Sequence, residues 1–555
     1  MAADTVQPEV QAEGGRRGRL VMLVDNAVNG DSRVQKLARS AAELGWDVTL
    51  LGRSPTAEPQ TWKLGEAKVR LLPMPRLMSK RRHEYRRAML RWPLAYPPTG
   101  IPTQRAAAVR AWRADIDLRV KLLDIAQRSG KESAADQRWR RRWLYLERVA
   151  CGVRRRWTSA RRRMLTLARG RRQLTSPWDR LYTWFWLTVS KERAWRKLEP
   201  SLWDYEFAYG PVIDELAPDL IHANDFRMLG VGARAKIRAL AGRQHRTELV
   251  WDAHEFLPGI KPWAANARWK PGHLAHEREY APYADAVMTV SPALSELLRD
   301  AYRLPEMPSV VLNAPAVDHD PEPHVGVLTA SLRQQCGISS ETPLMVYSGV
   351  AAEQRGLATM VEAMPQLDGV HVALVVNHPD GKLVADLVDR ARTLGVADRL
   401  HPLPYVPHWQ VVGFLSGADV GVIPIHHWPN HEIALITKFF EYSHARLPLV
   451  VSDVKTMAET VRATGQGEVF RAKDVADFVR AVRAILADPR RYRAAYDTPG
   501  LLEGWTWEAQ VRVLDEVYSR LCPPGVPAAD DATVADHFPV AANHTIGDVA
   551  VRPRG

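Results

Sequence analysis

The chain of 555 residues is too long for one hydrophobic core, and its hydrophobic and charged fractions of 46% and 25% exclude a disordered or fibrous protein. Its net charge of +13 is unevenly distributed: residues 76–175 contain 28 lysines and arginines against 7 acidic residues, whereas the rest of the chain contains 48 against 56. The basic character therefore belongs to one segment, with a net charge of +21 inside an otherwise acidic chain, and we expect two or three domains.

The cysteines and the apolar runs indicate the compartment. Cys151, Cys336 and Cys522 are widely spaced and odd in number, so they form neither a disulfide framework nor a metal-binding pattern. We therefore expect a reducing, cytoplasmic environment. Residues 1–15 contain acids and no apolar run, unlike a signal peptide, and no stretch approaches the roughly 20 apolar residues of a membrane span.

Residues 19–51 have the pattern of a strand, a helix and a second strand. This order is typical of the first unit of a doubly wound parallel sheet in an α/β protein. The loop between the first strand and the helix carries Asn29, Gly30 and Asp31. Loops at this end of a parallel sheet are where ligands are contacted, so we predict a ligand-contact loop here.

Residues 61–200 do not continue this α/β pattern. They contain 10 of the 19 tryptophans, together with arginine clusters such as Arg154–Arg156 and Arg161–Arg163. Apolar residues recur at steps of three and four, which predicts helices with one aromatic face and arginine-rich flanks. We expect an α-helical, Arg/Trp-rich insertion in the first domain over 61–200. The recurring residues are Leu122, Ile125, Trp139, Trp143, Leu146, Val149, Val153 and Trp157.

The α/β pattern returns after residue 200 and then repeats. Buried-strand patterns at 218–225, 248–255 and 284–291 complete a first Rossmann-like domain, and a series beginning at 344–349 predicts a second. A helical run follows Trp505, and the last residues are rich in Pro, Ala, Asp and Val without a period, which is typical of a disordered tail. The limits that we predict are 18–60 with 201–315 for the first domain, 316–325 for a linker, 326–503 for the second domain, 504–522 for a terminal helix and 523–555 for the tail.

Lys438 and Glu441 lie between two short apolar runs, 419–425 and 447–453, that have the pattern of buried parallel strands. Residues 437–445 have helical spacing, which places both charged side chains on one face. A helix that begins at the carboxyl end of a parallel strand directs its first N–H groups toward the crevice where nucleotides bind. Lys438 can then bind a phosphate and Glu441 can accept hydrogen bonds from a ribose, which suits a nucleoside diphosphate. An ordinary solvent-exposed pair, contributing about 0.2–0.5 kcal/mol, is the alternative.

This segment resembles the donor-site motif of the family-4 retaining glycosyltransferases, in which Pro-Asn-Lys-x-Phe-Glu-Tyr precedes Gly-x-Pro-Val-Val-x-Ser-Asp. Ile436 and Thr437 stand in place of Pro-Asn, and Arg446 stands in place of the glycine. The three strand patterns after residue 200 are similar to signatures of the family's acceptor domain. Asn224 stands where a second histidine is common, and the role of His222 in the same signature stays open. The resemblance implies the GT-B fold, in which two Rossmann-like domains face a cleft and a terminal helix crosses back onto the first domain. It covers residues 18–55, 205–315 and 340–520.

The resemblance also implies roles for particular residues. His254 would contact the transferred sugar, and Arg355 and Lys438 would bind the donor diphosphate and stabilise the leaving group. A buried structural histidine and a solvent-exposed arginine are the alternatives for His254 and Arg355. The family's first glutamate falls at Ile433, next to Glu432, which leaves open whether Glu432 takes its place. The other predicted residues are Glu441, Gly349, Gly356 and Thr437 for the donor, and Asn29, Gly30 and Asp31 for the acceptor-side loop.

The resemblance implies a hexosyl- or related transferase that retains anomeric configuration. Its donor would be a nucleotide-diphosphate sugar and its acceptor a glycan, a lipid-linked sugar or another cell-envelope molecule, without a cofactor. No metal is expected, because the phosphates would meet cations and a helix N-terminus.

The basic segment leads to an expected location and to two alternative functions. Basic helices in 76–175 suit anionic lipid, so we expect a cytoplasmic enzyme that is peripheral at the inner face of the membrane. One alternative is a nucleotide-sensing protein that binds nucleic acid or another polyanion through the insertion. Nothing in the chain matches a nucleic-acid module, so nucleic acid is not an expected partner. The other alternative is a nucleotide-sugar epimerase of the same fold, which would lack the acceptor-side signatures.

Overall fold

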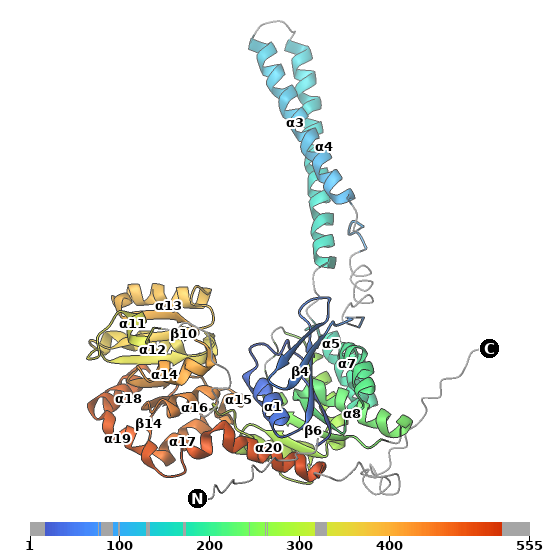
Figure 1. Cartoon of the computed structure of the whole chain (residues 1–555). Helices are drawn as coiled ribbons and strands as arrows, with labels where there is room; N and C mark the ends of the chain where they lie inside the picture. Colours follow the sequence, from blue (N-terminus) through green and yellow to red (C-terminus); the bar gives the residue numbers. More distant parts are fainter. Residues whose placement is uncertain are drawn as a thin grey trace, which may run out of the picture. The chain divides into compact units, whose positions relative to one another are not determined.

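The computed structural model describes residues 17–75, 77–78, 93–97, 100–128, 134–169, 174–243, 245–260, 262, 265–316 and 330–523. The chain divides into two compact units (Figure 1). The first unit contains both β-sheets, and the second contains a pair of long helices. The first comprises Met1–Pro75, Leu181–Trp263 and Arg268–Gly555, and the second comprises Arg76–Arg180 and Ala264–Ala267.

The first sheet has eight strands in the order β3-β4-β2-β1-β5-β6-β7-β8. All neighbouring strands are parallel except β3 and β4, which are antiparallel. The chain leaves β1 for β2 on one side and later returns to β5 on the other, so the strand order reverses between β1 and β5. The strands are β1 Arg19–Leu23, β2 Asp47–Arg53, β3 Gln60–Leu64, β4 Ala67–Leu72, β5 Leu220–Asn224, β6 Glu248–Ala253, β7 Ala286–Thr289 and β8 Ser309–Val310.

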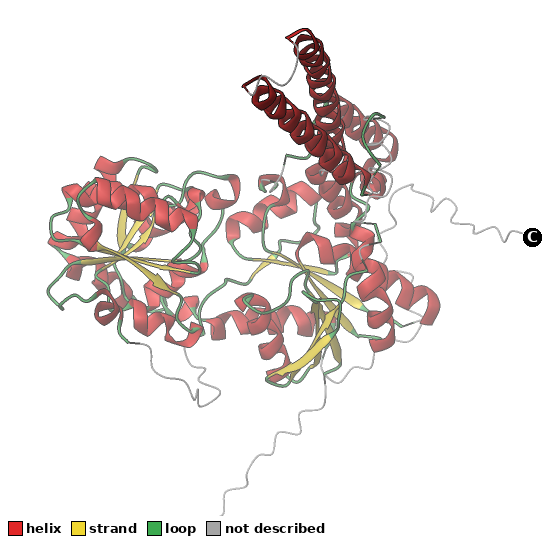
Figure 2. Ribbon diagram, turned by 90° about the horizontal axis from the view of Figure 1, so that it is seen from above, coloured by secondary structure: helices red, strands yellow, loops and turns green. Residues whose placement is uncertain are grey.

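Helices cover both faces of this sheet (Figure 2), which is why every residue of β5 and β6 is buried. On one face, Val21 and Leu23 pack in a core with Trp195 and Tyr209. The alternate residues Leu20 and Met22 belong to a second core on the other face. The helices are α1 Ser32–Glu43, α5 Pro177–Ser190, α6 Trp195–Leu198, α7 Leu202–Leu216, α8 Asp225–Arg243, α9 Trp269–Tyr280 and α10 Pro292–Tyr302.

The structure corrects both predicted limits of the segment 61–200. Residues Gln60–Leu72 form β3 and β4, which extend the first sheet at its edge. The side chains of β3 are exposed or half-buried, so an edge strand here lacks the apolar signature of a buried one. At the other limit, Trp195 and Leu198 are fully buried in the core of the first domain. The predicted linker at 316–325 falls outside the described residues apart from residue 316, and the predicted tail does so apart from residue 523.

The second sheet has six parallel strands in the order β11-β10-β9-β12-β13-β14. Its order reverses between β9 and β12, in the same way as the first sheet reverses between β1 and β5. Two Rossmann-like domains, as predicted, are therefore confirmed. The strands are β9 Leu344–Ser348, β10 His371–Val376, β11 Leu400–Pro404, β12 Val420–Ile423, β13 Leu449–Ser452 and β14 Gly467–Phe470.

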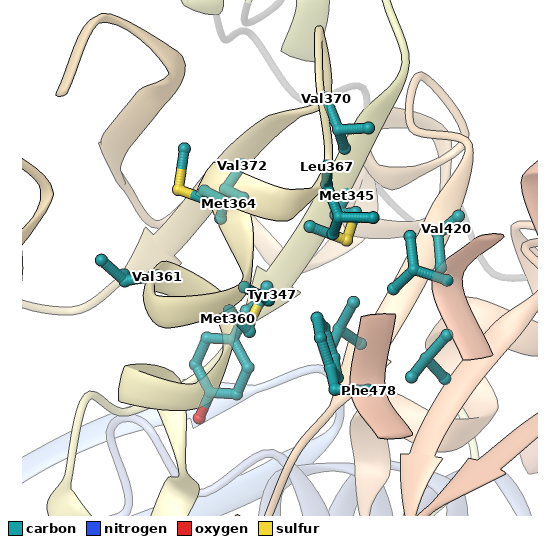
Figure 3. Close-up of a cluster of buried hydrophobic side chains, with 14 of the residues drawn as sticks. Met345, Tyr347, Met360, Val361, Met364, Leu367, Val370, Val372, Val420 and Phe478 are labelled. Carbon is teal, nitrogen blue, oxygen red and sulfur yellow. The ribbon is translucent and has the colours of Figure 1, made fainter. Parts of the chain in front are cut away.

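The second sheet is also covered on both faces. Met345 and Tyr347 point into a core that they share with Met360 and Phe478 (Figure 3), whereas the alternate residue Val346 belongs to the core on the opposite face. The helices are α11 Leu332–Cys336, α12 Leu357–Ala363, α13 Lys382–Thr393, α14 Val411–Leu415, α15 Pro429–Glu432, α16 Thr437–His444, α17 Lys455–Thr464, α18 Val475–Ala487 and α19 Pro489–Ala494.

The last helix, α20 (Trp507–Leu521), follows the second domain in sequence but packs on the first sheet. Trp507, Leu514 and Tyr518 are buried in the same core as Leu20 and Met22. The indole N–H of Trp507 also donates to Ser40 Oγ of α1 at 2.9 Å. The chain therefore passes between the two domains twice.

The second unit is a helical hairpin made of α3 (Ile101–Arg128) and α4 (Ala134–Arg169) (Figure 1). Its core is small and contains Val109, Ile116, Leu123, Leu144 and Cys151. Ion pairs cross between the helices, such as Arg141 with Asp124 at 2.7 Å. Within the part of the chain that the structure describes, no helix is long and apolar enough to span a bilayer.

Candidate active site

A cavity of about 990 Å³ is lined by residues of both Rossmann-like domains. This volume lies at the upper end of the range for small-molecule sites. The lining residues follow the carboxyl ends of parallel strands and include the loops after β1 and β9, one at each point of strand-order reversal. The predicted residues that line it are Asp31, His254, Gly349, Arg355, Thr437, Lys438 and Glu441.

Lys438 is held in the first turn of α16, against the end of β9. Its side chain is 8% exposed, and its amine lies 3.8 Å from the centre of the Tyr347 ring. Burial lowers the pKa of Lys438, and the nearby Arg355 charge lowers it further. A β-carbon on Gly349 would lie 2.3 Å from the lysine Nζ, so only glycine leaves room for the amine. The charged form of this amine is therefore poorly solvated, and an anionic ligand would favour it.

Glu441 lies one turn further along α16, close to a segment of the first domain. Burial raises the pKa of Glu441, and the charges of Lys438 and Lys36 oppose this rise. Lys36 of α1 donates to Asn313 Oδ1 at 3.2 Å, and Asn313 Nδ2 donates to Thr437 Oγ1 at 2.8 Å. Polar contacts thus run from α1 through Asn313, in the crossover between the two domains, to Thr437 in the first turn of the helix that carries Glu441.

Arg355 ends the short 3₁₀ helix Glu353–Arg355, just before α12. Within the described residues its guanidinium has neither a hydrogen bond nor an ion pair, although it lines the cavity. Gly356, which follows it, has a φ of +71°, and a β-carbon there would lie 1.8 Å from the carbonyl oxygen of Pro424. Gly356 does not line the cavity. It acts instead through the backbone, since only glycine permits the turn that directs Arg355 toward the cavity.

His254 follows β6 and belongs to a buried hydrogen-bond network. Its Nε2 lies 3.0 Å from Asp252 Oδ2, and its Nδ1 lies 3.5 Å from Asp225 Oδ2. Arg33 makes two hydrogen bonds to the Asp252 carboxylate, at 2.9 and 2.8 Å. His222 Nδ1 pairs with Tyr518 Oη of α20 at 2.7 Å, and its Nε2 lies 3.5 Å from Asp252.

This network holds His254 in its protonated form. Burial alone would lower the pKa of His254, but the carboxylates of Asp225 and Asp252 outweigh it and raise the pKa to about 9. At His222 the net result is the opposite, because burial outweighs the raising effect of Asp252 and the pKa is lowered. The Nε2–H of His254 is taken by Asp252, so the imidazolium has its Nδ1–H, 3.5 Å from Asp225, to donate to a ligand near neutral pH, and it is a poor base.

Three predicted residues besides Gly356 lie outside the cavity lining. Asn29 and Gly30 are exposed in the loop after β1, and only their neighbour Asp31 lines the cavity. Glu432, at the end of α15, does not line the cavity: its carboxylate lies 2.7 Å from His427 Nδ1 and accepts the Lys455 N–H at 2.8 Å. A donor contact by Glu432 stays a prediction, and it requires the carboxylate to leave these partners.

From the sequence we assigned no role to Arg33, Asn313 or Asp225. Arg33 lies in the first turn of α1 and is only 4% exposed. A periodic pattern does not predict a buried arginine. Asp225 has a φ of +62°, a backbone conformation that no sequence pattern marks here. Asn313 lies in the short segment after β8, and its link to Thr437 depends on the arrangement of both domains.

The arrangement places cations and a helix N-terminus in the second domain and a protonated histidine in the first, around one cavity. Such a site can bind a diphosphate and stabilise its charge as a bond to it breaks. Among the residues that the structure describes, no group of three or more His, Cys, Asp or Glu side chains is placed to hold a metal ion.

Comparison with protein families matches two parts of the chain. Residues 146–319 match the model described as Glycosyltransferase Family 4, and residues 329–498 match the model described as Glycosyl transferases group 1. Among curated proteins, the glycogen synthase of Mycobacterium tuberculosis is 25% identical over 307 residues, which cover 54% of this chain and 68% of that one. The D-inositol 3-phosphate glycosyltransferase of Xylanimonas cellulosilytica is 23% identical over 316 residues, which cover 51% of this chain and 75% of that one.

Solved structures show the same fold at low sequence identity. Sucrose-phosphate synthase from Thermosynechococcus elongatus is 16% identical with a TM-score of 0.54, over 91% of this chain and 98% of that one. HepE from Anabaena, in complex with UDP and glucose, is 12% identical with a TM-score of 0.52, over 91% of this chain and 100% of that one.

Two Rossmann-like domains that share one cavity, together with these structural neighbours, define the GT-B class of glycosyltransferases. The resemblance expected from the donor-site motif is confirmed, since models of both halves match. The two family-model matches and these structural neighbours support a family-4 glycosyltransferase of the GT-B class. The protein is therefore a transferase that uses a nucleotide sugar.

Proposed function

We propose that this enzyme transfers a hexose or related sugar, with retention of configuration, from a nucleotide-diphosphate sugar to a membrane-attached glycan or lipid-linked acceptor. The observation that carries the proposal is the opposition of His254 to Lys438, Arg355 and Glu441 around one cavity. Each side chain has the chemistry that one part of a nucleotide sugar requires. Glu441 accepts the ribose hydroxyls, the two cations bind the diphosphate, and His254 donates to the sugar.

The reaction replaces one bond at the anomeric carbon. The bond from this carbon to the diphosphate oxygen breaks, and a bond to an acceptor hydroxyl forms on the same face. The acceptor proton passes to the departing phosphate oxygen, so charge balances without a protein base. Lys438 and Arg355 stabilise the growing negative charge of the leaving group, and the first turn of α16 adds its N–H dipoles. His254 stays protonated throughout and holds the sugar.

The proposal of an acceptor at the membrane rests on the basic segment and on the relatives. Residues 76–175 carry a net charge of +21, which suits the anionic surface of a cytoplasmic membrane leaflet. The relatives act on acceptors of different kinds, to judge from their names, so they support transfer to a hydroxyl acceptor without choosing one. HepE was solved with UDP, which makes UDP the first nucleotide to test.

A calorimetric titration with UDP, ADP and GDP tests the proposal first. Glu441→Gln removes the charged acceptor for the ribose hydroxyls. Charged hydrogen bonds contribute about 1.5–3 kcal/mol, so the affinity for the nucleotide should fall about ten- to a hundredfold. Glu459→Gln, at an exposed glutamate of α17 in the same domain, is the matched control and should bind normally. Unchanged affinity in the Glu441 variant would remove this helix from the donor site.

Incubation of the protein with a panel of nucleotide sugars then identifies the donor. Slow release of the nucleoside diphosphate, without added acceptor, is expected for one sugar and one base. The anomeric configuration of the product, read by proton NMR, decides retention. An inverted product would contradict the proposed route.

A further inference from the structure

Helix α5 (Pro177–Ser190) presents an apolar face to solvent. Five large apolar side chains of this helix are exposed, and their spacing of three and four residues places them on one side. Their exposed fractions are 63% for Trp178, 48% for Leu181, 62% for Trp184, 47% for Phe185 and 62% for Val189.

The opposite side of α5 is fixed to the first domain. Tyr182, Trp186 and Leu187 pack against the core that contains Trp195. The guanidinium of Arg268 lies 4.2 Å from the centre of the Tyr182 ring, and the Lys197 amine lies 5.3 Å from the Trp186 ring. The helix is therefore held rigidly, and its outward aromatic face cannot turn inward without losing these contacts.

The distribution of charge indicates what covers this face. No residue from Leu181 to Ser190 is charged, whereas Arg180 precedes this stretch and Lys191, Glu192 and Arg193 follow it, all four exposed, so three cations and one acid flank it. An apolar face bordered by cations matches the boundary between acyl chains and anionic headgroups. A second copy of this chain would bring like charges together, which repel each other. The segment 76–175, which precedes α5 in the sequence, adds a net charge of +21 to this repulsion.

We propose that α5 docks the enzyme on an anionic bilayer, with its outward face in the headgroup–acyl boundary and its flanking cations on lipid phosphates. Tryptophan favours this depth, because its ring is apolar and its N–H stays within reach of water. The inference deepens the proposed function, since it names the surface that would present the acceptor. Docking through α5 can be distinguished from electrostatic attraction by the basic segment. Salt screens the attraction between charges but does not weaken the burial of apolar side chains.

Flotation of the full chain with vesicles tests the proposal. We expect binding to vesicles of phosphatidylcholine with phosphatidylglycerol and weak binding to phosphatidylcholine alone. Trp184→Ser and Phe185→Ser should each weaken binding to the mixed vesicles about tenfold, including at high salt. Leu394→Ser is the matched control, at an apolar residue of the second domain that is 38% exposed, and should bind like the unaltered protein.

Two further measurements separate the possible results. Nucleotide binding and donor hydrolysis without vesicles should be unchanged in the α5 variants, so lost vesicle binding with intact hydrolysis supports docking. Failure of all proteins to hydrolyse any donor would instead count against the proposed function alone. Vesicle binding equal to that of the Leu394 control overturns the inference. So does light scattering that shows a dimer of the unaltered chain converted to a monomer by Trp184→Ser, since a second copy would then cover α5.

Discussion

Arg33 and Asp252 form a buried pair in which the guanidinium and the carboxylate share two hydrogen bonds. The relative exposures of the two side chains are 4% and 0%, so the pair is taken almost completely out of water. Burying such a pair costs solvation energy, and removing one partner typically costs about 3–5 kcal/mol. The buried pair fixes the Asp252 carboxylate, and this carboxylate in turn orients the ring of His254 at the cavity.

His254 should give the enzyme an alkaline limit. Its folded pKa of about 9 exceeds the ordinary value of 6.5, so its stabilising charge is fully present below pH 6.5 and is lost as pH rises through 9. Activity and stability should therefore both fall above pH 9. Asp225→Asn removes a raising charge and should move this limit downward by about one pH unit.

The pH profile of kcat/KM checks this shift, with Asp453→Asn, at a carboxylate bound to His427, as the control. Arg33 and His222 also contact the Asp252 carboxylate in this network, and Asp225→Asn should leave both contacts unaltered. Burial lowers the pKa of Lys36 to about 7, so a second transition near neutral pH should persist in the Asp225 variant. An alkaline limit that stays at pH 9 in Asp225→Asn would contradict the assigned cause.

Lys438→Met should separate stability from turnover. Burial lowers the pKa of Lys438, so burying this amine costs free energy in the folded protein, and the variant should be more stable by about 1–3 kcal/mol. Turnover should fall about a hundred- to a thousandfold, because the leaving group loses a cation. Thermal unfolding and donor hydrolysis measure the two effects. Lys382→Met, at an exposed lysine of α13, should alter neither, and a destabilised Lys438 variant would refute the argument.

At the scale of elements, the turn between β9 and α12 depends on one glycine. Gly356→Ala would place a β-carbon 1.8 Å from the Pro424 carbonyl oxygen at a φ of +71°, so the loop must move. We expect a loss of roughly 2–4 kcal/mol in stability and at least a tenfold loss of activity, since Arg355 would shift. Gly395 has the same φ of +71° and no neighbour within 4 Å, so Gly395→Ala measures the backbone strain alone. Equal unfolding temperatures for the two variants would show that the contact is unimportant.

The elements show how far the sequence could lead. The buried strands of both sheets have continuous apolar runs, so two Rossmann-like domains were predictable. The strand β3 (Gln60–Leu64) was not predictable, because it is an edge strand with exposed polar side chains. It is recognised as a strand only by its pairing with β4. Arg446 occupies the position of an expected glycine and does have a left-handed φ of +54°, a constraint that the arginine itself conceals.

The candidate site divides in the same way. Lys438 and Glu441 are neighbours on one short helix, so local spacing was enough to bring them together. The network around His254 joins residues from α1, β5, β6 and α20, which lie hundreds of positions apart. Local spacing does not show the partners of Glu432 either, because its carboxylate pairs with His427 and with the Lys455 N–H.

At the scale of the whole molecule, the second unit should determine affinity for charged surfaces. Replacing residues 76–175 by a short Gly/Ser linker removes a net charge of +21 and should abolish the salt-sensitive part of binding to anionic vesicles, since each arginine contributes about 1 kcal/mol near such a surface. Flotation at low and high salt measures this part, and UDP titration verifies that the nucleotide site is intact. Equal binding of the shortened and full chains to anionic vesicles would contradict it.

The position of α20 has a consequence for how the protein is made. The first sheet is complete in sequence by Val310, but the helix that covers one of its faces begins only at Trp507. At 5–20 residues per second, a ribosome needs on the order of 10–40 s to translate the intervening stretch of roughly 200 residues. During that interval the nascent first domain exposes apolar side chains such as Leu20 and Met22, which α20 later buries. The second domain can finish folding before the first, and the emerging chain offers chaperones a site that disappears when translation ends.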